Sequence, residues 1–270
     1  MNTYALKLLA IVLMLIDHIG VILVSRTDNW NLYLLCRGLG RLAFPIFAFL
    51  LVEGFYRSSN VKKYIERLGL FALISEIPFD IALYQVRYGS TIWQDLFRNA
   101  GGRFDTAPLE MVFHRLFEHQ NIFFTLFLGL LLMYYLKQVE RKFKNQDVLR
   151  NVWEALLVIC FSAFAYLIKC DYEMAGILVI LAFYVFRGSK LLQSAALFII
   201  TISLLCNVKY FLQTGNILNI IGLLATLAML PISLYNDKKG KDVKYLFYIF
   251  YPGHLIVLYL LTLIISWNVS

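Results

Sequence analysis

An aspartate and a histidine stand side by side within an otherwise apolar stretch, MLIDHIG, at residues 14 to 20. Histidine titrates nearest to neutral pH, so His18 could act as a general base that takes a proton from an attacking amine or hydroxyl. Asp17 would lie about 100° away from His18 around a helix. We therefore expect Asp17 to pair with an arginine, and the group that orients the base to come from a different helix.

Two arginines, Arg37 and Arg41, lie within the next apolar stretch. They are four residues apart and share a helix face, where two guanidinium groups repel each other unless an anion lies between them. Asp17, Glu76, Asp80 or an anionic ligand could supply that negative charge. Arg41 is also a candidate for stabilising the oxyanion that forms when a nucleophile attacks a carbonyl group.

Further polar residues are expected at the same depth of the membrane, among them Glu76 and His254. A charge in hydrocarbon costs at least about 2.5 kcal/mol, so such side chains must face one another or a wet cavity. An active site or a transport site is the resulting hypothesis. His18 is the favoured base, with His254 as the next candidate. The predicted catalytic residues are His18, Asp17, Arg41, Arg37, Glu76 and His254.

The composition indicates what kind of protein positions these groups. Of the 270 residues, 60% are hydrophobic and only 16% are charged, which is typical of an integral membrane protein. Apolar stretches of about 20 residues predict an all-α, polytopic bundle of about nine transmembrane helices, forming a single domain over residues 1–270. The predicted spans are 4–24, 32–56, 63–85, 119–137, 151–169, 172–186, 191–208, 215–235 and 244–266.

The net charge of +8 reports topology, because basic residues gather in the connections that follow the even-numbered spans. The positive-inside rule predicts a cytoplasmic N-terminus and an exported C-terminus in a multi-pass protein of the cell membrane. No basic and aromatic pattern in the sequence suggests nucleic acid. The long connection 87–118 is expected on the exported side, where it could cap the site. Nearby Glu110, His114, Glu118 and His119 fit a solvated turn better than a metal site, so we expect no metal.

Several segments resemble the successive motif blocks of the TraX family. They are LKLLAIVLMLIDHIG, GRLAFPIFAFLLVEGF, KYIERLGLFALISEIPFD, NIFFTLFLGL, CDYEMAGIL and YNDKKGKDVKYLFYIFYPGHL. The family is named for a conjugation protein that acetylates the N-terminus of pilin, and it is similar to the wider superfamily of transmembrane acyltransferases. In that superfamily a histidine of the first helix and arginines of the next helix form the core of the site. His18, Arg37 and Arg41 match those positions.

The resemblance implies an acyl-CoA-dependent transferase of the cell envelope, with acetyl-CoA as the donor by family analogy. The acceptor would be an exported amine or hydroxyl: a peptide N-terminus, a glycan and a small amine all stay open. The phosphates of the donor need cations on the cytoplasmic side. The expected donor-binding residues are Arg57, Lys62, Lys63, Lys238, Lys239, Lys241 and Lys244.

Two other functions are consistent with charges inside a membrane. A proton-coupled transporter would gather the same residue types, although such proteins usually have repeated halves and the sequence contains no internal repeat. A non-catalytic assembly factor for a surface polymer is the third possibility, because a fold does not fix a function. Release of free thiol from acetyl-CoA would separate the enzyme from both.

Overall fold

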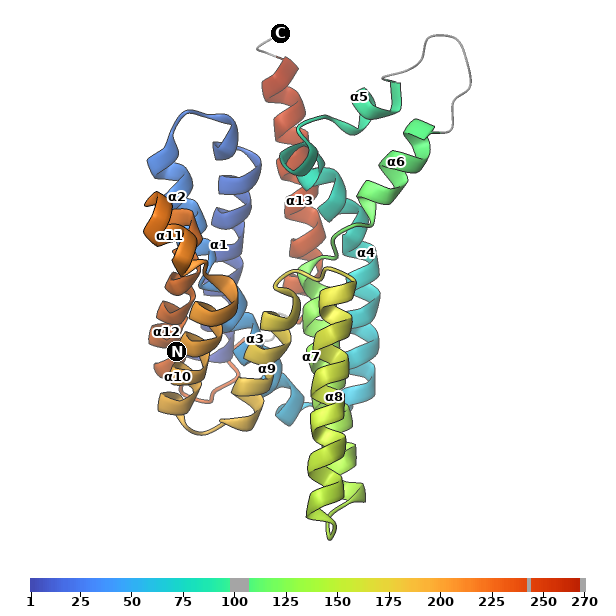
Figure 1. Ribbon diagram of the computed structural model, residues 1–270, viewed down its shortest axis with the longest axis vertical. Helices are drawn as coiled ribbons and strands as arrows, with labels where there is room; N and C mark the ends of the chain where they lie inside the picture. The colour runs from blue at the N-terminus through green and yellow to red at the C-terminus, as the bar shows by residue number, and fades with distance from the viewer. Residues whose placement is uncertain (98–106, 242–243, 268–270) are drawn as a thin grey trace.

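The computed structural model of the protein describes residues 1–97, 107–241 and 244–267 (Figure 1). Over these ranges the chain is helical, which confirms the all-α prediction, and a bridge between Gln120 and Cys170 is the one β interaction. A π-helix (Thr201–Leu205) follows α10, and a 3-10 helix (Ile221–Ala228) precedes α12. The α-helices are α1 (Thr3–Ile22), α2 (Trp30–Gly40), α3 (Ala43–Arg57), α4 (Val61–Tyr88), α5 (Ile92–Phe97), α6 (Ala107–Leu116), α7 (Ile122–Lys142), α8 (Asp147–Leu167), α9 (Glu173–Val185), α10 (Lys190–Ile200), α11 (Val208–Thr214), α12 (Met229–Ser233) and α13 (Lys244–Trp267).

Within the described residues, six helical segments are long and apolar enough to cross a membrane. They are Thr3–Arg26, Trp30–Arg57, Val61–Tyr88, Ile122–Lys142, Asp147–Leu167 and Tyr245–Ile265. A seventh is added if Lys190–Leu205 and Val208–Thr214, which are bent by 60°, form one crossing. The apolar helices α9 and Ile221–Ser233 are shorter. The 13 residues of α9 reach about 20 Å, less than the hydrocarbon thickness of about 30 Å, so the count of nine stays a prediction.

Pro45 explains why the second span is divided into α2 and α3. A proline has no N–H to bond the carbonyl group four residues earlier, here that of Arg41, and its ring clashes with that carbonyl. The helix accordingly stops at Gly40 and starts again at Ala43, with Pro45 in the first turn, where backbone N–H groups lack helical partners in any case. Arg41 is thereby placed at a break between two half-helices.

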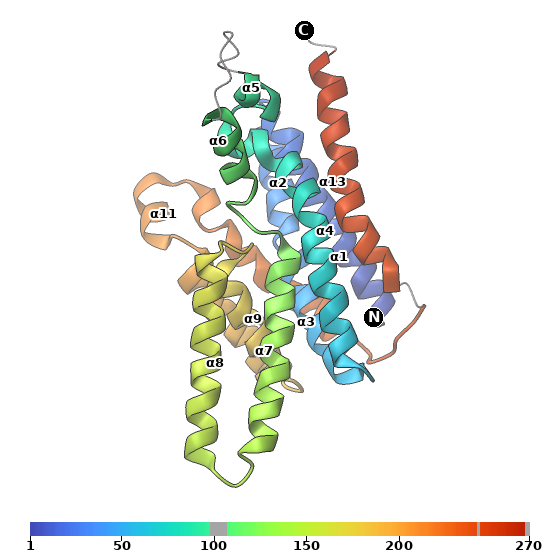
Figure 2. The ribbon, with the colours of Figure 1, turned by 90° about the vertical axis from the view of Figure 1, so that its right-hand side faces the viewer.

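The helix α3 lies at the centre of the bundle. Almost every residue from Ala43 to Phe55 is buried, and α1, α7 and α9 pack around it. Figure 2 shows α1 and α13 at one edge of the molecule and α8 at the opposite edge. Phe49, Phe123 and Tyr251 are among the largest fully buried side chains between these helices. This packing fixes α1, α3 and α13 relative to one another, which matters because α1 carries His18 and α13 carries His254.

The N-terminus lies beside the connection that leads into α13. The amide of Thr3 donates to the carbonyl of Lys238, and the amide of Asn236 donates to the carbonyl of Met1, each over 2.8 Å. Both α1 and α13 therefore start at the same end of the bundle, whereas α13 finishes at the other end (Figure 1). A first helix that starts at one end and a last helix that finishes at the other agree with an odd number of crossings. The assignment of one end to the cytoplasm stays a prediction of the positive-inside rule.

The connection 87–118 contains α5 and α6, while its residues 98–106 lie outside the described part. Asp95 is 1% exposed and joins three helices. Its carboxylate accepts a hydrogen bond from the Tyr84 hydroxyl over 2.8 Å and pairs with Arg115 over 2.6 Å. These contacts fasten α5 and α6 to α4 at the end of the bundle where α13 finishes (Figure 2). A role of the connection as a cap stays a prediction.

Candidate functional site

His18 of α1 and His254 of α13 face each other in the interior although they are 236 positions apart. The Nδ1 atom of His18 lies 2.7 Å from Nε2 of His254, and the two ring centroids are 4.9 Å apart with the ring planes 28° from parallel. The other nitrogen of His254, Nδ1, lies 2.8 Å from the carbonyl oxygen of Phe250. Two of the predicted site residues thus form a hydrogen-bonded pair that comes from two different helices.

Asp17 forms an ion pair with Arg37 of α2, as the sequence analysis predicts for this carboxylate. The Nη1 atom of Arg37 lies 2.6 Å from Oδ1 of Asp17, and both side chains are mostly buried. Gly40 lets α2 approach α1 this closely, because a Cβ atom at that position would collide with the Asp17 side chain. The ion pair therefore depends on a glycine one helical turn after Arg37.

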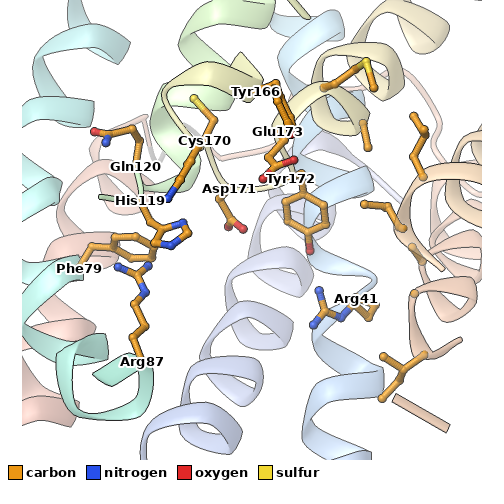
Figure 3. A pocket seen from close by; sticks show the side chains of 18 of the residues that line it. Arg41, Phe79, Arg87, His119, Gln120, Tyr166, Cys170, Asp171, Tyr172 and Glu173 are labelled. Carbon is orange, nitrogen blue, oxygen red and sulfur yellow. The ribbon is translucent and has the colours of Figure 1, made fainter. Parts of the chain in front are cut away.

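Arg41 points from the helix break towards the turn between α8 and α9. Its guanidinium is hydrogen-bonded to the side chain of Tyr172 and interacts electrostatically with Asp17 and Asp171. Figure 3 shows the hydroxyl of Tyr172 directed at this guanidinium. The Nε atom of Arg41 is buried. Arg41 is thus held in place, and its Nε–H group makes no hydrogen bond within the described residues.

The turn between α8 and α9 contributes two residues that the sequence analysis does not single out, Asp171 and Tyr172. Lys169, Tyr172 and Glu173 have positive φ angles of 50°, 64° and 44°, in the left-handed region that favours glycine. Gln120 holds the turn: its amide donates to the carbonyl of Lys169 over 3.1 Å, and its carbonyl accepts from the amide of Asp171 over 3.0 Å. Backbone of this kind clusters at functional sites. The sequence carries two signals for this turn, the polar CDYE between two apolar stretches and the motif block CDYEMAGIL that contains it.

A cavity of about 40 Å³ borders His18, and we call it the histidine cavity. Asp17, Gly40, Phe44 and Tyr251 also line it. A much larger cavity of about 440 Å³, the upper cavity, lies towards the end of α4 and is lined by Arg41, Arg87, Lys169 and Glu173, among others (Figure 3). Asp171 and Tyr172 border both cavities. The strained turn therefore forms the boundary between the histidine cavity and the upper one.

A third cavity, of about 350 Å³, lies near the start of α1, and we call it the lower cavity. Phe47 borders both this cavity and the histidine cavity. Thr3 at the start of α1 and Arg57 at the end of α3 line it. Arg87, which lines the upper cavity, lies in the last turn of α4, a helix that begins beside Arg57 and runs away from it. His18 consequently lies between two cavities at opposite ends of the bundle.

Two of the predicted donor-binding residues, Arg57 and Lys239, line the lower cavity. Arg57 is also paired with Asp237 and, over 3.6 Å, with Glu53. The lower cavity adds two cations that the sequence analysis leaves out, Lys7 and Arg67. Of the remaining predicted cations, the side chain of Lys244 lies outside the described residues. The other four predicted cations are exposed and do not line the lower cavity: Lys62, Lys63, Lys238 and Lys241.

Glu76 is placed away from the histidines. Its Oε2 atom accepts hydrogen bonds from the side-chain amide of Asn121 over 2.5 Å and from the backbone amide of Asn121 over 3.1 Å. Asn121 in turn caps α7, since its Oδ1 accepts from the amide of Phe123 over 2.9 Å. Glu76 is not one of the described residues that line the histidine cavity. The structure therefore assigns Glu76 to the junction of α4 and α7 and does not bring it to the predicted base.

A salt bridge outside the spans supports the strained turn from above. The Nζ atom of Lys169 lies 2.6 Å from Oε1 of Glu118, and the Tyr88 hydroxyl donates to Oε2 of Glu118 over 2.9 Å. The hydrogen bonds from Lys169 and Tyr88 lower the pKa of Glu118 to about 2. Glu118 and Lys169 thereby tie the segment that precedes α7 to the turn that follows α8.

Comparison with known proteins gives a consistent picture. The chain is 27% identical over 262 residues to a probable fimbrial assembly protein, FimC of serogroup H1, from Dichelobacter nodosus, a match that covers 95% of this chain and 94% of that protein. No solved structure matches the chain. The sequence model of the family described as "TraX protein" matches residues 2–96 and 103–262. With nearly its whole length inside that match, the chain belongs to the TraX family.

Proposed function

We propose that the protein is a membrane-embedded acetyltransferase, which moves the acetyl group of cytoplasmic acetyl-CoA to an acceptor on the other side of the membrane. The observation that carries the proposal is the position of His18, beside a small cavity that lies between two large ones. A donor and an acceptor that enter from opposite ends would meet beside this imidazole. Holding two reactants in contact is itself a large part of catalysis.

The lower cavity suits the donor. Coenzyme A carries several phosphate oxygens, and Arg57, Arg67, Lys7 and Lys239 at this cavity supply positive charge for them. Its walls are otherwise largely apolar and aromatic, which suits the pantetheine arm that would carry the thioester inwards. The acetyl group would then pass Phe47 and reach the histidine cavity, whose volume of about 40 Å³ leaves room only for a small group.

The proposed reaction is a direct acyl transfer. The acceptor nitrogen or oxygen attacks the thioester carbonyl carbon, and His18 takes the proton that the nucleophile loses. Negative charge develops on the carbonyl oxygen, and Arg41, which lines the upper cavity beside the turn of Asp171 and Tyr172 that borders both cavities, is the group proposed to stabilise it. The carbon–sulfur bond then breaks, and the proton passes from His18 to the leaving sulfur. The products are the acetylated acceptor and free CoA.

The upper cavity suits a polar acceptor. It carries both signs of charge, from Arg41, Lys169, Asp171 and Glu173. Part of its wall is irregular backbone around Leu205 and Gly222, at the π-helix and the following 3-10 helix. Irregular backbone at membrane depth is tolerated where it is buried in protein or lines a water-filled cavity. A peptide N-terminus, a glycan and a small amine all fit this chemistry.

A role in the assembly or modification of a pilus is the wider context that we propose. Membership of the TraX family and the similarity to a fimbrial assembly protein support it. Among the three acceptor classes, a peptide N-terminus of a pilus subunit is therefore the first to test. The name of the fimbrial relative also supports a second candidate function, that of an assembly factor without chemistry of its own.

The test uses the full chain purified in detergent. We expect it to release free thiol from acetyl-CoA and to acetylate a synthetic peptide with a free N-terminus, as followed by mass spectrometry. His18→Ala should reduce kcat by about 10²- to 10⁴-fold, the usual worth of a general base. His114→Ala is the matched control, because this histidine is exposed on α6.

Two results would contradict the proposal. One is a well-folded protein that releases no thiol with any of the three acceptor classes. The other is wild-type turnover by His18→Ala. If His18→Ala still supports pilus assembly in cells, the non-catalytic assembly role is favoured. Uptake of a solute into proteoliposomes without thiol release would favour a transporter.

A further inference from the structure

A general base needs more than an imidazole in the right place. Neutral histidine carries its proton on one ring nitrogen and a lone pair on the other, and only the lone pair can accept a proton. Of the two histidines, His18 lines the histidine cavity, whereas His254 is not among the described residues that line it. The nitrogen of His18 that faces His254 is Nδ1, so Nε2 is the nitrogen of His18 that this contact does not engage.

The contacts of His254 determine where the protons lie. A carbonyl oxygen can only accept, so the 2.8 Å contact with Phe250 requires a proton on Nδ1 of His254. When His254 is neutral, its Nε2 then carries the lone pair. The 2.7 Å contact between the two histidines accordingly requires a proton on Nδ1 of His18. The lone pair of His18 is left on Nε2, where a base is needed.

We propose that His254 is a positioning residue of the acyl transfer, an inference that rests on the proposed function. It holds His18 in the tautomer with a proton on Nδ1 and a basic Nε2. Asp17 does not take this part, because its carboxylate pairs with Arg37. In a hydrolase triad a carboxylate holds the catalytic histidine in its tautomer and orientation. Here the Phe250 carbonyl and His254 together take that role.

The surroundings of His254 suit a fixed partner. The side chain is 7% exposed, and its ring stacks on that of Phe250 with the centroids 4.8 Å apart. The ring of Tyr251 lies against both histidines, at 5.7 Å from His254 and 6.1 Å from His18. These contacts hold the His254 ring so that its two nitrogens stay aligned with Phe250 and His18.

The proton path follows from this arrangement. The acceptor loses a proton to Nε2 of His18, which becomes an imidazolium with a proton on each nitrogen. The Nδ1 proton lies on the hydrogen bond to His254, so the positive charge is shared between the two rings. The proton on Nε2 later goes to the sulfur of CoA, and the pair returns to its starting state.

Two substitutions at position 254 test the inference. In His254→Gln the side-chain oxygen can take the place of Nε2 as an acceptor, whereas His254→Ala removes the acceptor. We expect His254→Ala to lose on the order of 10²-fold or more in kcat, and His254→Gln to stay within about tenfold of wild type, with the KM for acetyl-CoA unchanged in both. His114→Ala is again the matched control.

The tautomer itself is read by ¹⁵N NMR on protein labelled at histidine, of which the chain has four. We expect His18 to carry its proton on Nδ1 in the wild type and in His254→Gln, and to lose this preference in His254→Ala. A His18 protonated on Nε2 in the wild type would overturn the inference. So would wild-type kcat in His254→Ala, or equal losses in both variants with an unchanged His18 signal, since those indicate a purely structural role.

The kinetic and the NMR measurements together separate this inference from the proposed function. The NMR signals do not depend on turnover, so they decide whether His254 sets the tautomer even if no acyl transfer is found. Absence of turnover in a wild type that has the expected tautomer would contradict the proposed function alone.

Discussion

Arg37 of α2 and Asp17 of α1 form a salt bridge of 2.6 Å. Asp17 directly precedes His18, the histidine that borders the histidine cavity. The side chains are only 17% and 22% exposed, so each charge depends on the other for compensation. The pair also ties α2 to α1 directly before the break at Arg41. Asp17 therefore acts on the site through the position of α2 and not through the base.

Asp17→Asn should destabilise the protein by about 3 kcal/mol, because breaking a buried ion pair leaves the remaining charge uncompensated. Thermal unfolding in detergent measures the change. The exposed pair of Arg150 and Asp147 provides the control, since Asp147→Asn should change the free energy of unfolding by well under about 1 kcal/mol. Adding Arg37→Gln to Asp17→Asn should recover part of the loss. Equal melting temperatures for wild type and Asp17→Asn would show that the pair contributes nothing.

The lower cavity gives a prediction about the donor. Lys239→Ala and Arg67→Ala should each raise the KM for acetyl-CoA several-fold, because each removes a cation that lines this cavity. Added salt should have a similar effect by screening. Steady-state kinetics measure the change, with Lys144→Ala, an exposed lysine elsewhere, as the control. If neither substitution at the cavity changes KM, the donor does not bind there.

The pair of Glu118 and Lys169 gives a prediction about pH. The pKa of Glu118 falls from its ordinary value of 4.5 to about 2 in the folded protein, because Lys169 and Tyr88 stabilise the charged form. Its contribution to stability is therefore complete above about pH 4.5 and is lost as the pH falls towards 2. The melting temperatures of wild type and Glu118→Gln should differ above pH 5 and converge below it. A difference that does not change with pH would contradict this assignment.

The positions of the termini give a prediction about topology. The N-terminus and the connection before α13 are hydrogen-bonded to each other, so they lie on the same side of the membrane. Reporter tags inserted at residue 240 and at the N-terminus should both be cytoplasmic, and a tag at the C-terminus should be exported. Tags at residue 240 and at the C-terminus on the same side would show that α13 does not cross the membrane and would contradict the predicted nine-span topology.

The polar site residues that could be predicted from the sequence are those that lie within apolar, membrane-spanning stretches. His18, Asp17 and Arg37 are visible because an apolar span has no reason to carry them unless they have partners. Pairing of Asp17 with an arginine followed from the angle between neighbouring residues on a helix. The partner of His18 could not be chosen from the sequence, because the contact with His254 depends on the packing of α1 against α13.

Asp171 and Tyr172 were missed for the opposite reason. They lie in a turn between two helices, where polar residues are ordinary, and only the left-handed backbone of the turn directs them at Arg41. Glu76 shows that a buried carboxylate can be recognised from the sequence while its partner cannot. Its burial was foreseeable, but a carboxylate that caps a helix junction through Asn121 has the same sequence signature as one that faces a reactive histidine.

The number of transmembrane helices was hard to predict because hydropathy does not show how long each helix is. The stretch 172–186 is apolar apart from Glu173, yet α9 has 13 residues because it begins only after the left-handed turn. The stretch 191–208 ends in a π-helix and then bends, and hydropathy carries no information about such a break.

The three cavities have an electrical consequence. Where water fills the upper and lower cavities, the insulating part of the membrane is reduced to the few side chains around the histidine cavity, and a voltage across the bilayer falls mainly over them. Moving one elementary charge through that full drop is worth about 2.3 kcal/mol per 100 mV. The charge that arises on the paired histidines lies inside this thin layer. Turnover in sealed vesicles should therefore respond to the membrane potential, whereas turnover in detergent has no such dependence.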